Sequence, residues 1–230
     1  MLDDRGTSGV KIVTEAEWLA CTDPQPMLEY LRGKASDRKL RLFACACCRR
    51  LWHLMNDKRS RDAADVAEEY ADGLLMDVDF SCHFDAWRAA LYKSRQSRGR
   101  RSVYAAILTS CHFDAWHSAL YTSRSTAKSV GRGGDKFSEY EVQAALLCDI
   151  FGPLPFRPIT LGPSWLTWHS GLLVSMARRM YDSRDFSDMP VLADALEESG
   201  CQDQDILRHC RSGGEHVRGC WVVDLLLGKE

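Results

Sequence analysis

The segment from Asp37 to Met55 constrains the fold most, because its apolar residues follow two faces of one helix. One stripe repeats at intervals of three and four residues and contains Leu40, Phe43, Cys47, Leu51 and Leu54. A second stripe has the same helical spacing and contains Cys45, Cys48, Trp52 and Met55. A helix that is apolar on two faces is typical of the centre of a bundle.

Signals for the start and end of a helix recur along the whole chain. Thr14 with Glu17 matches a capping box, and Asp23-Pro24 matches an N-cap followed by proline at the first helical position. Ser36 and Asp203 are further N-caps, and glycines at 33, 73, 200 and 228 fit helix ends. The sequence therefore predicts an all-α protein with the form of an irregular helical bundle.

The middle of the chain contains a duplication. Residues 81–95 are repeated at 110–124, an offset of 29. Two copies are too few for a solenoid, so we expect an inserted, duplicated helical hairpin. We predict a disordered extension over 1–13, an N-terminal helical region over 14–124, a linker over 125–137 and a C-terminal helical region over 138–230. The two helical regions are expected to pack as one domain.

Composition excludes several classes of protein. Apolar residues make up 45% of the chain, which is too many for a disordered protein, and no run of them is long enough to span a membrane. Thirty basic against 32 acidic residues make nucleic acid an unlikely partner, although a basic run covers 93–101. The first 13 residues lack the apolar core of a secretory signal, so a cytoplasmic protein is expected, with its ten cysteines reduced and mostly packed in the core.

Several segments resemble a protein family that is multiplied in the genomes of planctomycete bacteria. They are TEAEWL at 14–19, RKLRLFAC at 38–45, ADALEE at 193–198 and the tail HVRGCWVVDLLLGKE at 216–230. Relatives in this family begin at Met-Thr-Glu where this chain has Val13-Thr14-Glu15, which implies that Met1 to Lys11 are an upstream extension from a misassigned start codon. The resemblance implies no activity, because none is assigned to the family.

The C-terminal part offers a candidate zinc site. His209, Cys210, His216 and Cys220 carry ligand atoms that zinc prefers, and the four-residue spacing of His216 and Cys220 would place both on one helix face. Neighbouring residues diverge by about 100° on a helix, which weakens His209 and Cys210 as a joint pair of ligands. The alternative is that Cys210 and Cys220 lie in the core while the histidines lie on the surface.

Other candidate sites have stronger packing explanations. The Cys45-x-x-Cys48 pair lies well inside a helix, without the activating N-terminal position of a redox dithiol. The repeated Cys82-His83 and Cys111-His112 are copies within the duplication, which adds no evidence for a site. The ring side chains of Trp165, Trp168 and His169 could line a pocket but are more typical of a core.

Two acidic residues, Asp194 and Asp224, lie inside apolar patterns. If they are buried, each needs an arginine partner such as Arg178 or Arg218, because an unpaired buried charge is costly.

The sequence favours a binding or scaffold module over an enzyme. No set of residues converges on a catalytic motif, and no cofactor other than zinc is indicated. We therefore expect a helical module that acts through an unidentified protein partner. The alternative is a zinc-binding protein or metal-dependent hydrolase that uses the C-terminal His/Cys cluster.

Overall fold

A computed structural model describes residues 12, 14–54, 58–76, 114–130 and 136–230. These residues form helices and contain no strand, which confirms the predicted all-α bundle for this part of the chain. The first copy of the duplicated segment, at 81–95, lies outside the described residues, as do the basic run at 93–101, Cys111 and His112.

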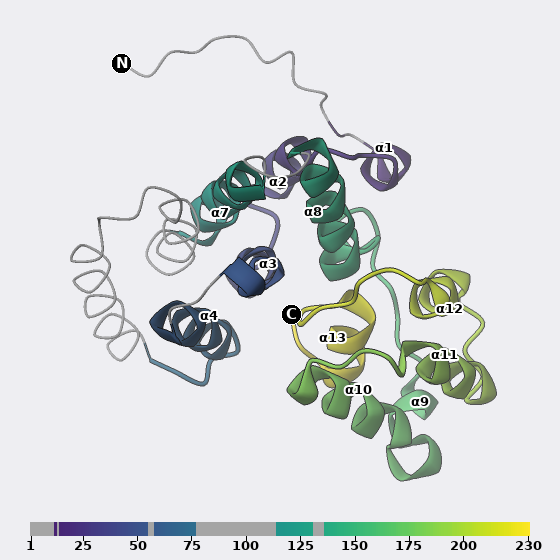
Figure 1. Cartoon of the computed structure of the whole chain (residues 1–230). Coiled ribbons are helices and arrows are strands. Elements are labelled where there is room, and N and C mark those ends of the chain that lie inside the picture. The colour runs from purple at the N-terminus through teal and green to yellow at the C-terminus, as the bar shows by residue number, and fades with distance from the viewer. Residues whose placement is uncertain (1–11, 13, 55–57, 77–113, 131–135) are drawn as a thin grey trace.

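The first half of the chain surrounds helix α3 (Figure 1). Its elements are α1 (Glu15–Leu19), α2 (Pro24–Leu31), α3 (Asp37–Arg50), the 3-10 turn η1 (Trp52–Leu54), α4 (Lys58–Ala71), α7 (Ala115–Val130) and α8 (Lys136–Phe151). The side chains of Thr14, Asp23 and Ser36 cap α1, α2 and α3 as predicted. Local side-chain chemistry therefore sets where these helices begin.

The two apolar stripes of α3 face different neighbours. Leu40, Phe43 and Cys47 of the first stripe enter a core shared with α1, α2, α7 and α8, while Cys48 of the second stripe packs against Ala63 of α4. Leu51, assigned to the first stripe, packs with Cys48 because the helix ends before it. The prediction that this helix is central is confirmed, but the helix ends at Arg50 and continues as a 3-10 turn. A helix buried on both faces leaves little freedom in how α4 and α7 can be placed.

The second half forms a separate core beside the first (Figure 1). Its elements are α9 (Pro163–Thr167), the 3-10 turn η2 (Trp168–Ser170), α10 (Leu172–Ser183), α11 (Met189–Glu198), α12 (Gln204–Arg211) and α13 (Trp221–Leu227). Trp221 and Leu173 are fully buried among these helices. The segment that follows α8, rich in proline, connects the two cores.

The predicted boundary between the two regions differs from the structure. Residues 125–130 are helical and belong to α7, so the linker predicted over 125–137 is wrong for this part. Helix α8 lies in the first core through Leu147 and Ile150, although the prediction assigned it to the C-terminal region. The predicted linker appeared polar because α7 buries small hydroxyl residues, such as Ser123 and Thr126, which lack an apolar signature.

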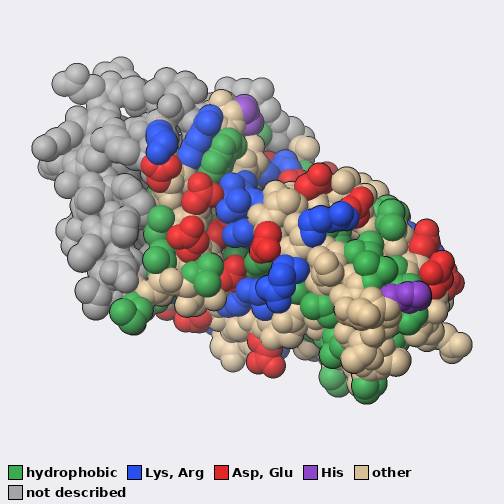
Figure 2. Space-filling model, turned by 90° about the horizontal axis from the view of Figure 1, so that it is seen from below, with side chains coloured by type: hydrophobic (Ala, Val, Ile, Leu, Met, Phe, Trp, Pro, Cys, Tyr) green, Lys and Arg blue, Asp and Glu red, His purple; other side chains and the backbone are tan. Residues whose placement is uncertain are grey.

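Buried ion pairs join the two halves. The guanidinium of Arg38 on α3 donates to both carboxylate oxygens of Asp224 on α13, at 2.7 and 3.0 Å, and its Nε donates to Asp72 at 3.0 Å. Figure 2 shows basic and acidic side chains next to each other across the middle of one face. Asp224 is buried and pairs with an arginine as expected, but that arginine is Arg38, with Lys39 as a second partner, and not Arg178 or Arg218.

Arg218 has a different partner. It binds Glu68 of α4 together with Arg49 and Arg184, so that three guanidinium groups surround one carboxylate that is only 3% exposed. Asp194 is exposed and pairs with Arg211. The three arginines that bind Glu68 therefore connect α3 and α4 with the segment after α10 and the segment before α13.

Gly152 allows Trp221 to pack against the end of α8. Its φ is +49°, and a Cβ added there would lie 2.6 Å from the indole ring. Gly228 also has positive φ, at +64°, but has open space around it. Replacing each glycine by alanine therefore distinguishes two contributions to the loss of stability. Both variants carry the backbone strain, and only Gly152→Ala also carries the cost of overpacking.

We predict that Gly152→Ala lowers the free energy of unfolding by about 2–4 kcal/mol, from left-handed backbone strain plus overpacking. Gly228→Ala is expected to cost about 1–2 kcal/mol, because it carries only the backbone strain. Urea denaturation measures both. Equal losses in the two variants would contradict the packing of Gly152 against Trp221.

Asp72 makes the stability of the ion pairs between the two halves depend on pH. Burial acts to raise its pKa, but hydrogen bonds from Tyr181 and Lys229 and the charge of Arg38 outweigh burial, so the pKa lies below its usual value. A carboxyl whose folded pKa is depressed stabilises the protein above its unfolded pKa of about 3.9 and loses that contribution as pH falls through the folded value.

We therefore expect Asp72→Asn to be less stable than the parent protein at pH 7, with the difference shrinking as the pH is lowered toward 2. Denaturant unfolding at a series of pH values measures this. Asp62→Asn is the control, because the Asp62 side chain is 44% exposed and its ion pair is with Lys58, which is 89% exposed. A difference for Asp72→Asn that stays constant down to pH 2 would disprove the assignment.

Candidate metal centre

The segment from His216 to Cys220 positions the candidate centre. It leads from α12 into α13 without forming a helix, so the helical spacing assumed for His216 and Cys220 is wrong. A turn at Gly219, with φ of +92°, brings the two residues together instead. A Cβ at this position would lie 3.1 Å from Leu42 Cδ1, so glycine also permits a close approach to α3.

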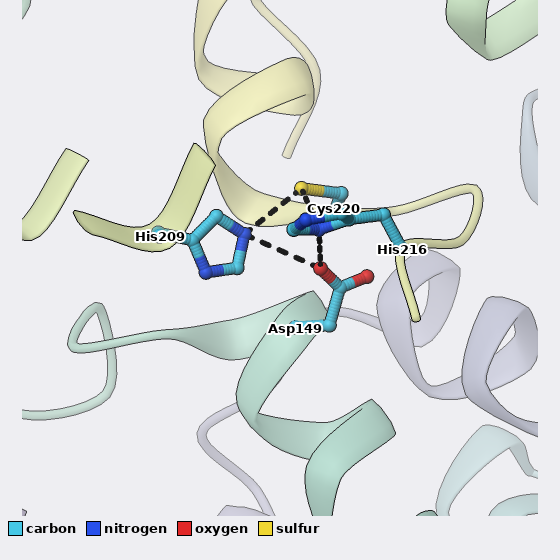
Figure 3. A group of neighbouring side chains, drawn as sticks. All are labelled: Asp149, His209, His216 and Cys220. Carbon is cyan, nitrogen blue, oxygen red and sulfur yellow. Dashed lines mark hydrogen bonds and ion pairs between the residues drawn. The ribbon is translucent and has the colours of Figure 1, made fainter. Parts of the chain in front are cut away.

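Asp149 lies near the end of α8 and points into this segment (Figure 3). Its Oδ2 accepts a hydrogen bond of 2.9 Å from the backbone N–H of Val217. Its Oδ1 lies 2.6 Å from His216 Nδ1 and 3.2 Å from His209 Nε2. The carboxylate therefore joins α8 of the first core to three residues of the second half.

Cys220 completes the group from the other side. Its Sγ lies 3.2 Å from His209 Nε2 and 3.9 Å from His216 Nδ1. The four ligand atoms, from Asp149, His209, His216 and Cys220, all lie within 4.8 Å of one another. Figure 3 shows the four side chains converging from α8, α12 and the segment before α13.

The rings around the centre are packed tightly. The His209 ring centroid lies 4.9 Å from that of His216 and 5.2 Å from that of Trp221. The His209 and His216 side chains are 16% and 6% exposed, and Cys220 is fully buried. The alternative of histidines on the surface is therefore wrong.

The charge of Asp149 is balanced differently from that of the other buried carboxylates. Glu68, Glu139 and Asp224, which are equally buried, each pair with arginine or lysine. Asp149 pairs with two histidines. In the same group, His216 Nε2 is buried and has no hydrogen-bond partner among the described residues. These features single out Asp149 as the buried acid that lacks a permanent cation in the described part of the chain.

The distances fit a tetrahedral zinc ion. Zinc–ligand distances of about 2.0–2.3 Å place neighbouring ligand atoms of a tetrahedron about 3.3–3.6 Å apart. The separations of 3.2, 3.2 and 3.9 Å are close to these values, whereas the 2.6 Å contact between Asp149 and His216 would have to widen and the widest separation in the group, up to 4.8 Å, would have to shorten. One oxygen, two imidazole nitrogens and one sulfur are ligand types that zinc accepts.

Three of the four predicted ligands come together, and the fourth does not. Cys210 is fully buried in the second core and is replaced in the cluster by Asp149. The divergence expected between His209 and Cys210 on a helix accounts for this. The missed residue had a signal: Asp149 interrupts the apolar run Leu146-Leu147-Cys148-Asp149-Ile150-Phe151, where a lone acid indicates a buried partner.

The other candidates serve packing in the described residues. Cys45 and Cys48 are buried in α3, and neither forms a disulfide. Trp165 is 8% exposed and belongs to the second core, and the partly buried Trp168 packs against that core. His169 is exposed, so the core interpretation is wrong for this residue.

The geometry does not suit a cysteine nucleophile, although Cys220, His209 and Asp149 resemble a triad. Cys220 Sγ has no exposure, and burial raises the pKa of the Cys220 thiol well above its ordinary value. A reactive thiol requires both access and a lowered pKa.

We predict that Cys220 in the folded protein resists alkylation by iodoacetamide at pH 8. Cys21, which is partly exposed, should be labelled much faster. Mass spectrometry of the peptides measures both rates, and complete labelling in denaturant serves as the control. Labelling of native Cys220 at the rate of Cys21 would revive the nucleophile interpretation.

The described residues contain no helix that is long and apolar enough to cross a membrane. Comparison of the chain with protein families, with curated proteins and with solved structures finds no match. The resemblance to the planctomycete family therefore stays a prediction, and the chemistry of this chain rests on its own residues.

Proposed function

We propose that this chain binds one zinc ion through Asp149, His209, His216 and Cys220, and that the ion is structural. The observation that carries the proposal is the convergence of these four ligand atoms around a buried carboxylate that has no lysine or arginine partner among the described residues. A divalent cation would supply the charge that every other buried acid of the described residues receives from a basic side chain.

Charge balance supports zinc in particular. With Asp149 ionised and Cys220 as thiolate, the protein ligands carry two negative charges, which a divalent ion neutralises. A thiolate disfavours hard cations such as magnesium or calcium, which prefer oxygen ligands. The mixed set of nitrogen, sulfur and oxygen is suited to zinc.

The surroundings favour a structural ion over a metal-dependent hydrolase. Catalytic zinc keeps one coordination position for water or substrate, whereas four protein ligands fill a tetrahedron. Cys220 is fully buried and Asp149 is 4% exposed, so water has little access to these two ligands. Under this proposal the ion holds a helical scaffold in shape, in keeping with the binding module that the sequence predicts.

Metal analysis of purified protein tests the proposal. We expect close to one zinc per chain by elemental analysis after gel filtration. His209→Ala and Cys220→Ser should each lose most of it, because three ligands bind zinc far more weakly than four. Cys210→Ala is the matched control: it removes the neighbouring thiol, which does not point into the centre, and should retain zinc.

Two results would contradict the proposal. The first is a parent protein that takes up no zinc after exposure to equimolar zinc and desalting. The second is zinc content that falls in Cys210→Ala but not in Cys220→Ser, which would place the ion elsewhere. Circular dichroism of each variant separates loss of a ligand from loss of the fold.

A further inference from the structure

The indole N–H of Trp221 has no hydrogen-bond acceptor among the described residues. Trp221 is only 1% exposed, and a buried tryptophan N–H usually has a partner. Its Nε1 is not one of the polar atoms that are fully enclosed without a partner, so this atom reaches open space. The structure therefore contains a buried donor that faces a space rather than a protein acceptor.

That space is a cavity of about 390 Å³ where the two halves meet. Trp221 lines it together with residues from the end of α2, the start of α3 and the end of α8. None of the four proposed zinc ligands belongs to the lining. Small-molecule sites have volumes of about 300–1,000 Å³, so the cavity is large enough for a compact organic ligand.

Gly152 shows which edge of the indole ring borders the cavity. A Cβ added at Gly152 would lie 2.6 Å from Trp221 Nε1. The N–H edge of the ring therefore lies beside the chain between Phe151 and Leu154, and both of these residues line the cavity.

The wall around this N–H is apolar. Leu31, Phe151, Leu154 and Leu225 line the cavity with Trp221. Phe151 and Trp221 belong to the cores of different halves, so the wall is formed where those cores meet. Aromatic and aliphatic side chains at such a wall favour an apolar ring.

The charged residues of the lining are of both signs. They are Lys34, Lys39, Lys229, Asp224 and Glu230. Lys39 Nζ lies 3.3 Å from Asp224 Oδ2, and Lys229 Nζ pairs with a carboxylate outside the lining at 3.1 Å. Lys34 and Glu230 add one charge of each sign. The lining therefore has no uniform charge that would select an anion or a cation, and burying an unmatched ion is costly.

From this arrangement we propose that the cavity binds an uncharged, largely apolar ring compound that carries one hydrogen-bond acceptor, such as a ketone oxygen. The ring packs against Phe151 and Leu225, and the oxygen accepts from Trp221 Nε1. This binding site does not rest on the proposed zinc ion.

Calorimetric titration of the purified protein with 1-indanone tests the proposal. The matched probes are indane, which lacks the acceptor, indane-1-carboxylate, which is an anion, and 1-aminoindane, which is a cation. We expect 1-indanone to bind about fivefold more tightly than indane, through the added hydrogen bond. Both ions should bind at least about tenfold more weakly than 1-indanone, because their charge is not matched in the cavity.

Nuclear magnetic resonance reports on the donor itself. The Trp221 indole N–H signal, identified by its loss in Trp221→Phe, should shift on addition of 1-indanone and much less on addition of indane. Trp221→Phe should lower the affinity for 1-indanone to that for indane. Trp165→Phe is the control, because Trp165 belongs to the same core but lies outside the cavity lining.

A second pair of variants fills the space without removing the donor. Leu225→Trp should abolish binding of 1-indanone and indane, whereas Leu227→Trp, on the same helix and outside the lining, should change neither. Circular dichroism melts check that each variant is folded, and this pair tests the site even if Trp221→Phe does not fold. Zinc analysis of Trp221→Phe separates an effect on the cavity from one on His209, whose ring contacts Trp221.

Absence of 1-indanone binding would overturn the proposal, as would an ion that binds as tightly as the ketone. Equal affinity for 1-indanone and indane would show that the Trp221 N–H does not select an acceptor, and would also overturn it. Affinity that is unchanged in both Trp221→Phe and Leu225→Trp would place the ligand elsewhere on the protein and contradict the assignment.

Discussion

The buried carboxylate of Asp149 lies where the two cores of this protein meet, and the path of the chain on either side depends on how its charge is satisfied. Asp149 belongs to α8 of the first core, while His209, His216 and Cys220 belong to the second half. An isolated ionised carboxylate in an apolar interior is strongly unfavourable, so these partners are needed for the fold as well as for any metal.

The segment from His216 to Cys220 extends this connection to the rest of the molecule. His216 and Val217 contact Asp149, Arg218 reaches Glu68 of α4, and the Gly219 carbonyl accepts from Lys39 of α3. Four consecutive residues, 216–219, therefore join elements of both halves through polar contacts. An ion at Asp149 would fix the start of this segment. Through it, the ion would also hold the ion pairs that connect α3, α4 and α13 in place.

The sequence predicts well what is decided locally. The caps at Thr14, Asp23 and Ser36 and the two apolar stripes of α3 depend on residues within a few positions of each other. The pairing of Asp224 with Arg38 joins residues 186 positions apart, and no local pattern distinguishes Arg38 from Arg218 as its partner. Asp149 was missed for the same reason, since its ligand role appears only when α8 is placed against the segment before α13.

The central claim is that one zinc ion binds at this junction to one sulfur, two nitrogen atoms and one oxygen atom of the protein. X-ray absorption at the zinc edge of the purified protein tests it most directly. The account predicts a four-coordinate shell with one sulfur at about 2.3 Å and three nitrogen or oxygen ligands at about 2.0–2.2 Å. A zinc shell that lacks sulfur, or that contains two or more sulfurs, would contradict it.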